Sequence, residues 1–280
     1  MDTEIIQKPK KKFAIGAIFA FLSAITMAGF CLWEIIESGI TAVTLFAESL
    51  TAFLGSASLG NQIAASVALA NATANLSTCI GNVISLLSAV ALIALGVLLL
   101  LKVNSRIVGF LFAVPAAVLI LSFVLSVVVT IVNFIIYASM SMAGSSLAMS
   151  ALSLSMSVIT VGAWAICWGA AFAFVFVFGG GKEYQKPKAI MATLLGVAVG
   201  LLFAVASIVS IVVSQLMSGM VLWTYIQGML MNGLVIDFVY ILKTFGSAVY
   251  AVVKNVSYGV LFAVTGFFSV KWLISPYKKA

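Results

Sequence analysis

Hydroxyl and amide side chains recur at helical spacing in the middle of the chain. Two sets have members three or four residues apart: Ser122, Ser126, Thr130 and Asn133, and Ser150, Ser153, Ser157 and Thr160. This spacing places each set on one face of an α-helix. Such neutral groups can hydrogen-bond across a pair of membrane helices, or they can line a water-filled path. The pattern therefore supports two interpretations, a helix-packing seam and a pore lining.

Ionisable side chains are too few for acid–base or metal chemistry. The 280 residues include 14 Lys and Arg, 7 Asp and Glu, and no His. No nucleophile lies beside a base in the apolar segments, and no carboxylates are paired there. We therefore expect no enzymatic activity, no metal site and no cofactor.

Some charges are candidates for contacts outside the membrane. These are Glu37, Glu48, Asp237, Lys243 and Lys254. The two Glu and two Lys residues could form salt bridges between protruding segments, or they could simply make solvated faces, because exposed ion pairs contribute only about 0–1 kcal/mol.

A run of small residues indicates a close helix contact. Ala192, Gly196, Gly200 and Ala204 follow one another at intervals of four. Small side chains at this spacing allow two membrane helices to approach closely. The partner could be another helix of the chain or one of a second copy.

The polar, charged and small residues named above must be positioned by helices that lie in a membrane. The chain is 64% hydrophobic and 8% charged, with a mean hydropathy of +1.28. Soluble domains are about 45–50% apolar and about 25% charged. The composition excludes a water-soluble fold.

The basic residues indicate which side of the membrane each segment faces. Twelve of the fourteen fall in four groups: Lys8, Lys10, Lys11 and Lys12; Lys102 and Arg106; Lys182, Lys186 and Lys188; Lys271, Lys278 and Lys279. Basic residues mark the cytoplasmic side. We predict an all-α fold in the cell (plasma) membrane, with six transmembrane helices as three helical hairpins and both termini cytoplasmic.

The predicted organisation follows from these groups. It comprises a basic cytoplasmic segment (1–12), a first long hairpin (13–101) with an outer extension (about 37–82), a cytoplasmic loop (102–106), a second hairpin (107–178), a Gly/Lys cytoplasmic loop (179–188), a third hairpin (189–274) with an outer segment (about 214–254), and a basic cytoplasmic tail (275–280).

The first hairpin is longer than a bilayer requires. Each arm, 13–54 and 61–101, would form a helix of about 60 Å, roughly twice the hydrocarbon core. We expect these helices to extend beyond the bilayer on the outer side. In an alternative model, 37–82 forms two further short spans, giving eight in all, although Glu48 and the Asn residues of this segment disfavour it.

Two local motifs leave alternatives open. Asn71, Asn75 and Asn255 match the glycosylation acceptor pattern, although the first two also fit a helical stripe of polar residues. Cys31 and Cys79 would lie about 6 Å apart along the axis of the first hairpin. A disulfide is possible but not favoured there.

The predicted function is that of a non-enzymatic membrane subunit. We expect it to scaffold or line part of a larger translocation, secretion or envelope assembly, because a simple carrier would not need such long arms. The alternative is a self-sufficient channel or carrier for a small neutral or weakly polar solute. Expected partners are a bilayer with an anionic inner leaflet, and other membrane subunits or further copies of the chain, with no direct binding of nucleic acid.

Overall fold

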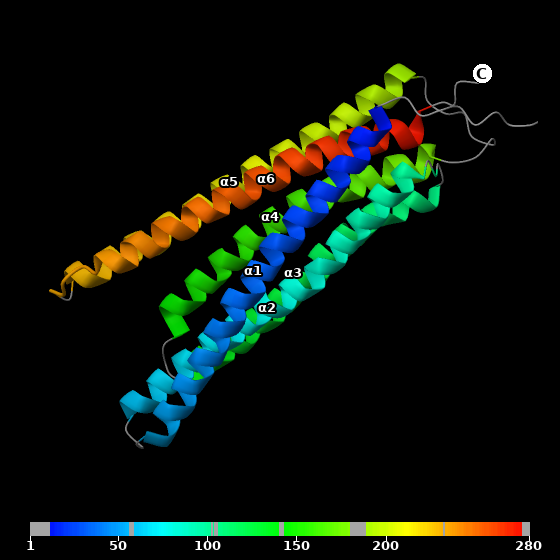
Figure 1. The fold of residues 1–280 in the computed structure, drawn as a ribbon. Helices are drawn as coiled ribbons and strands as arrows, with labels where there is room; N and C mark the ends of the chain where they lie inside the picture. The colour runs from blue at the N-terminus through cyan, green and yellow to red at the C-terminus, as the bar shows by residue number, and fades with distance from the viewer. Residues whose placement is uncertain are drawn as a thin grey trace, which may run out of the picture. The chain divides into compact units, whose positions relative to one another are not determined.

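The computed structural model is built from long α-helices. It describes residues 12–55, 59–101, 103, 106–139, 143–179, 189–231 and 233–275. The helices are α1 (Lys12–Gly55), α2 (Leu59–Leu100), α3 (Phe110–Ser139), α4 (Ala143–Phe178), α5 (Ala189–Met231) and α6 (Phe238–Ile274), with a short 3-10 turn, η1 (Arg106–Gly109), before α3 (Figure 1). All six α-helices are long and apolar enough to cross a membrane. This confirms the prediction of an all-α fold, and six such helices indicate a multi-pass membrane protein.

Most of the predicted cytoplasmic segments lie outside the described residues. This applies to the basic residues Lys8, Lys10, Lys11, Lys102, Lys182, Lys186, Lys188, Lys278 and Lys279. Only the backbone is described for Lys12, Arg106 and Ser150.

Three of the helices are about twice as long as a bilayer core requires. α1, α2 and α5 contain 44, 42 and 43 residues. At 1.5 Å per residue each is about 65 Å long, against a hydrocarbon core of about 30 Å. The predicted outer segment of the third hairpin, about 214–254, consists mostly of the continuations of α5 and α6.

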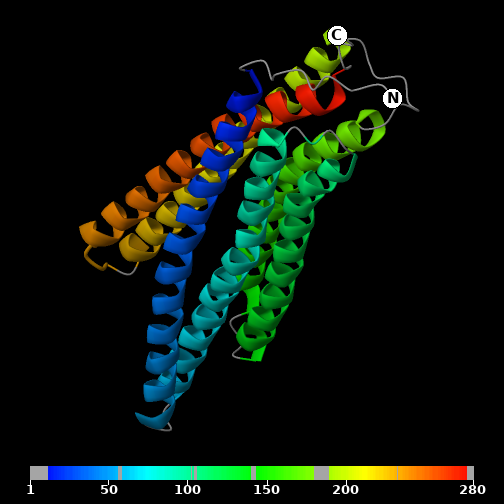
Figure 2. The same ribbon diagram turned by 45° about the vertical axis from the view of Figure 1, so that its right-hand side comes forward.

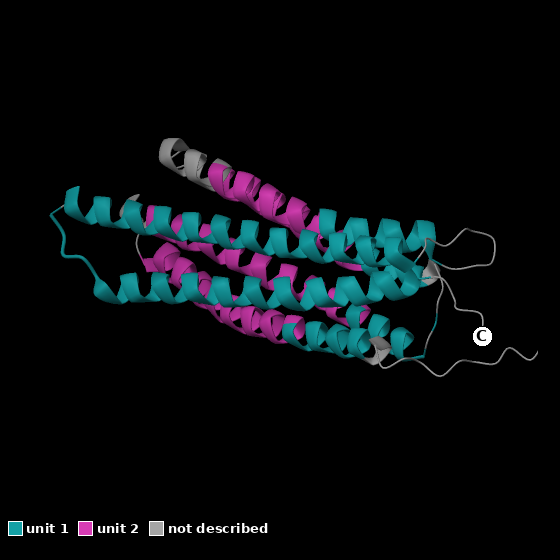
Figure 3. Cartoon of the chain, turned by 90° about the horizontal axis from the view of Figure 1, so that it is seen from above, with its two compact units in different colours: residues 1–26, 92–113, 166–280 teal, residues 27–91, 114–165 magenta. Residues whose placement is uncertain are grey.

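The chain divides into two compact units (Figure 3). The first contains residues 1–26, 92–113 and 166–280, and the second contains residues 27–91 and 114–165. The division falls inside α1, α2, α3 and α4, whereas α5 and α6 belong wholly to the first unit.

An aromatic cluster forms the core of the first unit. The ring of Trp168 in α4 lies 4.8 Å from that of Phe203 in α5 and 5.1 Å from that of Phe262 in α6, both edge-on. The ring of Phe112 in α3 lies 6.3 Å from that of Trp168, in a tilted arrangement. All four side chains are buried. Edge-to-face pairs contribute about 0.5–1.5 kcal/mol beyond the burial of their area, so this cluster holds four helices together.

The turn between α5 and α6 is closed by its own hydrogen bonds. α5 ends where Gly233 adopts a φ of +64°, with its N–H donating to Leu230 O (3.2 Å) and the N–H of Leu234 donating to Met229 O (2.9 Å). This is a Schellman motif. Asp237 then caps α6 by accepting the N–H of Val239 at 2.8 Å. The two helices run side by side from this turn (Figures 1 and 2).

Gly233→Ala should destabilise the hairpin. A Cβ in the left-handed region costs about 1–2 kcal/mol. The matched control is Gly219→Ala, because a Cβ there meets no atom within 4 Å and helical Ala is favoured over Gly by up to about 1 kcal/mol. Thermal unfolding in detergent micelles should show a lower midpoint for the first variant only. Equal midpoints for the two variants would contradict the strained turn.

Candidate functional site

A hydrogen bond in the second unit joins α2 to α3. Thr73 Oγ1 lies 2.8 Å from Asn133 Oδ1 and 2.8 Å from the carbonyl oxygen of Ala70 on its own helix. A hydroxyl has one proton to donate, so both contacts are satisfied when the Asn133 amide presents its NH₂ group to the hydroxyl. Asn133 belongs to a predicted stripe, whereas Thr73 does not. Asn71 and Asn75 fit the helical spacing of a polar stripe on α2 and Thr73 does not, so periodicity did not predict Thr73 as a contact residue.

Two further stripe hydroxyls bond to carbonyls of their own helices. Thr130 donates to the carbonyl of Ser126 at 2.8 Å, and Ser157 donates to that of Ser153 at 2.9 Å. Such bonds satisfy a hydroxyl inside a membrane helix without water. The hydroxyl oxygen of Ser122 is shielded from solvent and has no hydrogen-bond partner within the described structure. Thr160 is half-buried.

Two contacts join α1 to α2 in the second unit. Ser49 Oγ donates to Ala65 O at 2.9 Å, and Cys79 Sγ lies 3.8 Å from Ile35 O. In each pair the two residue numbers average 57, as expected for two antiparallel helices that follow one another in the chain. Cys31 and Cys79 are free thiols, so the disulfide left open by the sequence is not formed.

A buried hydroxyl pair joins α1 to α6 in the first unit. Ser23 Oγ and Thr265 Oγ1 lie 2.9 Å apart, and both residues are fully buried. Thr26 and Ser269 lie at helical spacing from Ser23 and Thr265, but these two-residue sets are shorter than the stripes that predicted contact faces, so the pair was not predicted. The available signal was a hydroxyl in an otherwise apolar run, which indicates a partner on another helix.

The small-residue face of α5 lies against α6. A Cβ added to Gly196 would be 2.9 Å from Phe267 O, and one added to Gly200 would be 3.4 Å from Ala263 O. Ala192 is buried, and Ala204 is half-buried. For the two glycines, the partner is therefore a helix of the same chain.

α6 contributes glycines of its own that the sequence analysis missed. A Cβ on Gly259 would overlap the side chain of Ser207, and one on Gly266 would lie 2.9 Å from Val199 Cγ1. Polar contacts flank this seam. Ser207 Oγ donates to Asn255 O at 2.7 Å, and Gln215 Nε2 donates to Ala248 O at 2.9 Å. α5 and α6 thus meet through close backbone approach and side chain-to-backbone hydrogen bonds.

The candidate outer charges belong to different units. Glu37 and Glu48 are exposed in the second unit. Asp237 and Lys243 are exposed in the first unit, where Lys254 Nζ lies 5.9 Å from the ring centroid of Tyr258. Asp237 has a structural role as the helix cap described above. A salt bridge between the Glu and Lys residues stays a prediction.

The amide groups of the candidate glycosylation residues take part in helix hydrogen bonds. Asn75 Nδ2 donates to Asn71 O at 2.9 Å, and Asn255 Nδ2 donates to Ala251 O at 2.9 Å. A glycan would be attached at these nitrogen atoms. Glycosylation stays an open question for these residues.

Among the described residues, no three His, Cys, Asp or Glu residues are grouped so that they could hold a metal ion. Compared with protein-family models, curated proteins and solved structures, the chain has no match.

Gly259→Ala should destabilise the α5–α6 seam. The added methyl group would overlap Ser207, and overpacking of this kind costs about 1–3 kcal/mol. Gly246→Ala, on the same helix with no atom within 4 Å of its Cβ, should be neutral or slightly stabilising. Thermal unfolding in micelles should separate the two variants, and adding Ser207→Gly to the first should restore part of the loss. No difference between the two single variants would argue against a tight seam.

Proposed function

We propose that the protein is a non-enzymatic membrane subunit that scaffolds or lines part of a larger translocation, secretion or envelope assembly. The observation that carries this proposal is the length of α1, α2 and α5, which have 44, 42 and 43 residues without a break. About 20 helical residues cross a bilayer core. A unit that only moves a small solute across the bilayer has no need of the remaining length.

The proposed orientation places the extra length on the outer side of the cell membrane. It rests on the twelve basic residues that fall beside or between the spans at the proposed inner face. Both termini then face the cytoplasm, and the turn after α1 and the turn after α5 face outward. The anionic inner leaflet is the lipid partner of the basic segments.

Exposed apolar side chains on the outer part of α1 support a role in assembly. Val43 is 72% exposed and Phe46 is 57% exposed, and both lie beyond the stretch expected to span the bilayer. A water-facing helix normally carries polar residues at such positions. Other membrane subunits, or further copies of the chain, are the partners that would cover this face, whereas helical spacing places Glu37 and Glu48 on the opposite side of α1.

A second candidate is a self-sufficient channel or carrier for a small neutral or weakly polar solute. It is favoured by the hydroxyl of Ser122, which is shielded and without a partner in the described structure. Buried polar atoms of this kind often bind water. The Ser and Thr stripes would then line a hydrated path.

Purification of the unchanged protein and of a variant with a polar α1 face distinguishes the two functions. Tagged protein in mild detergent should bring other membrane subunits in a fixed ratio, visible by native mass spectrometry. Val43→Ser with Phe46→Ser should remove those subunits and leave the unfolding midpoint unchanged. A lone protein or homo-oligomer that loses solute flux when Ser126, Thr130, Ser153 and Ser157 are changed to Leu would favour the channel.

The outer placement of the first hairpin can be tested separately. In a variant with its three cysteines replaced by Ala, Phe53→Cys should react with a membrane-impermeant maleimide on intact cells. Val90→Cys should not react, because this side chain, although 61% exposed on its helix, faces lipid in the proposed topology. Labelling of residue 53 only after lysis would support eight spans over six.

A further inference from the structure

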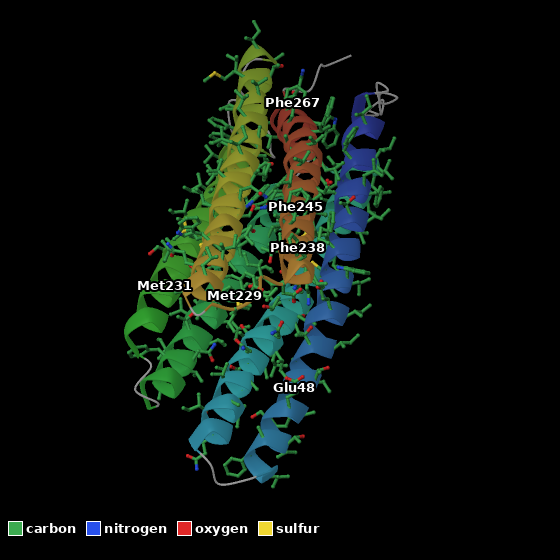
Figure 4. The ribbon with its side chains drawn as sticks, turned by 90° about the vertical axis from the view of Figure 1, so that its left-hand side faces the viewer. Glu48, Met229, Met231, Phe238, Phe245 and Phe267 are labelled. Atoms are coloured by element: carbon green, nitrogen blue, oxygen red, sulfur yellow. The ribbon has the colours of Figure 1, made fainter. Side chains whose placement is uncertain are left out.

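The end of the α5–α6 hairpin is covered with exposed apolar side chains. Exposure ranges from 57% for Leu234 to 90% for Val235. The set, called the apolar tip below, consists of Leu230, Met231, Leu234, Val235, Phe238 and Val239. Figure 4 shows Met231 at the end of α5 and Phe238 at the start of α6. The apolar tip therefore combines the last turn of α5, the connecting turn and the first turn of α6.

This distribution fits lipid better than a protein partner. A helix that docks into a protein groove presents one apolar stripe at i, i+3, i+4 and i+7. The apolar tip instead covers the closed end of a hairpin, with side chains from both arms and from the turn between them. Hydrocarbon adapts to such a surface on all sides.

The backbone of the turn already meets a requirement for entering lipid. The N–H groups of Gly233 and Leu234 donate to carbonyls of α5, and the N–H of Val239 donates to the Asp237 carboxylate. The N–H of Asp237 donates to the hydroxyl of Tyr225 at 3.0 Å. Unpaired backbone groups cost several kcal/mol in hydrocarbon, so a turn with internal partners suffers less on insertion.

Side chains typical of a membrane interface lie behind the apolar tip. Trp223 on α5 is 61% exposed, and Lys243 on α6 is exposed. Along the helix axes they lie about 15 Å from Gly233 and about 9 Å from Asp237. Trp is enriched at membrane interfaces, and Lys can extend its ammonium group to lipid phosphates. The distance for Trp223 matches the half-thickness of a bilayer core, about 15 Å, and Lys243 lies nearer the turn, from where its long side chain can extend to the interface.

We propose that the apolar tip inserts into the surface of a lipid bilayer other than the one spanned by the six helices. α5 exceeds the hydrocarbon core by about 35 Å, so its outer end stands clear of its own membrane. Asp237 and Lys243 are the charged residues among positions 189–253, and Lys243 complements anionic headgroups. This inference rests on the outer placement of the turn in the proposed function. The subunit would then connect two membranes.

Flotation with liposomes tests the inference on the full chain. Protein in nanodiscs should float with added liposomes of phosphatidylcholine and phosphatidylglycerol. Met231→Ser with Val235→Ser should weaken this binding at least about tenfold, since burial of one such side chain is worth about that factor. Val212→Ser with Leu216→Ser, two residues of α5 that are each 51% exposed but lie outside the apolar tip, should bind as the unchanged protein does.

A charge variant separates lipid insertion from protein docking. Asp237→Asn retains a side chain that caps helices well but removes the negative charge. Flotation should increase several-fold, because a neutral residue enters the bilayer surface more readily than a charged one. Unchanged or weaker flotation of this variant would count against insertion.

A fluorophore reports where the apolar tip lies. An environment-sensitive dye on Val235→Cys, in the variant without native cysteines, should shift to shorter wavelength when liposomes are added. A shift already present in nanodiscs alone would place the apolar tip in its own bilayer and overturn the inference. Pairing of nanodiscs without liposomes, abolished by Met231→Ser with Val235→Ser, would identify a second copy as the partner instead.

Failure of the inference can be told apart from failure of the proposed function. Ser247→Cys, exposed on α6 and farther from the apolar tip than Lys243, should react with impermeant maleimide on intact cells. Absence of that reaction overturns the outer placement on which both proposals rest. Reaction without flotation overturns the lipid inference alone.

Discussion

The constraint on which the rest of this structure depends is the pairing of backbone groups in hydrocarbon. No water is present there to hydrogen-bond an open N–H or C=O group, so each spanning segment must be a continuous helix. The same constraint applies to polar side chains within the spans. Thr130 and Ser157 return their hydroxyl protons to carbonyls of their own helices. The turn after α5 has internal partners as well, because the Gly233 N–H donates to Leu230 O and the Asp237 carboxylate accepts the N–H of Val239.

Association of these helices depends on close approach, because lipid is as apolar as the side chains and drives no hydrophobic collapse. Gly196 on α5 and Gly259 on α6 allow the two backbones to approach where a Cβ would collide. Single hydrogen bonds add specificity, as between Ser23 and Thr265. Trp168 of α4 then joins the α5–α6 pair, because its ring contacts both Phe203 and Phe262.

The features that suggest a function are those that membrane crossing does not require. α1 and α5 are far longer than a span, and both carry exposed apolar side chains in the excess length, such as Val43 and Val235. These surfaces differ in form. The one on α1 follows a helix and suits a protein partner, whereas the one after α5 covers the closed end of a hairpin and suits lipid. Together they support the proposal of a subunit whose outward segments provide its contacts.

The sequence by itself determined the number of helices and most of their bounds, because apolar length and interrupting charges are local properties of the chain. It also identified Gly196 and Asn133 as contact residues, since their spacing follows the helical period. Only the tertiary structure decided which partners they meet. Thr73 was selected over its neighbours Asn71 and Asn75 by the position of α3, and Ser23 and Thr265 are 242 residues apart. Periodicity defines a face of a helix, but the partner of that face depends on how separate helices pack.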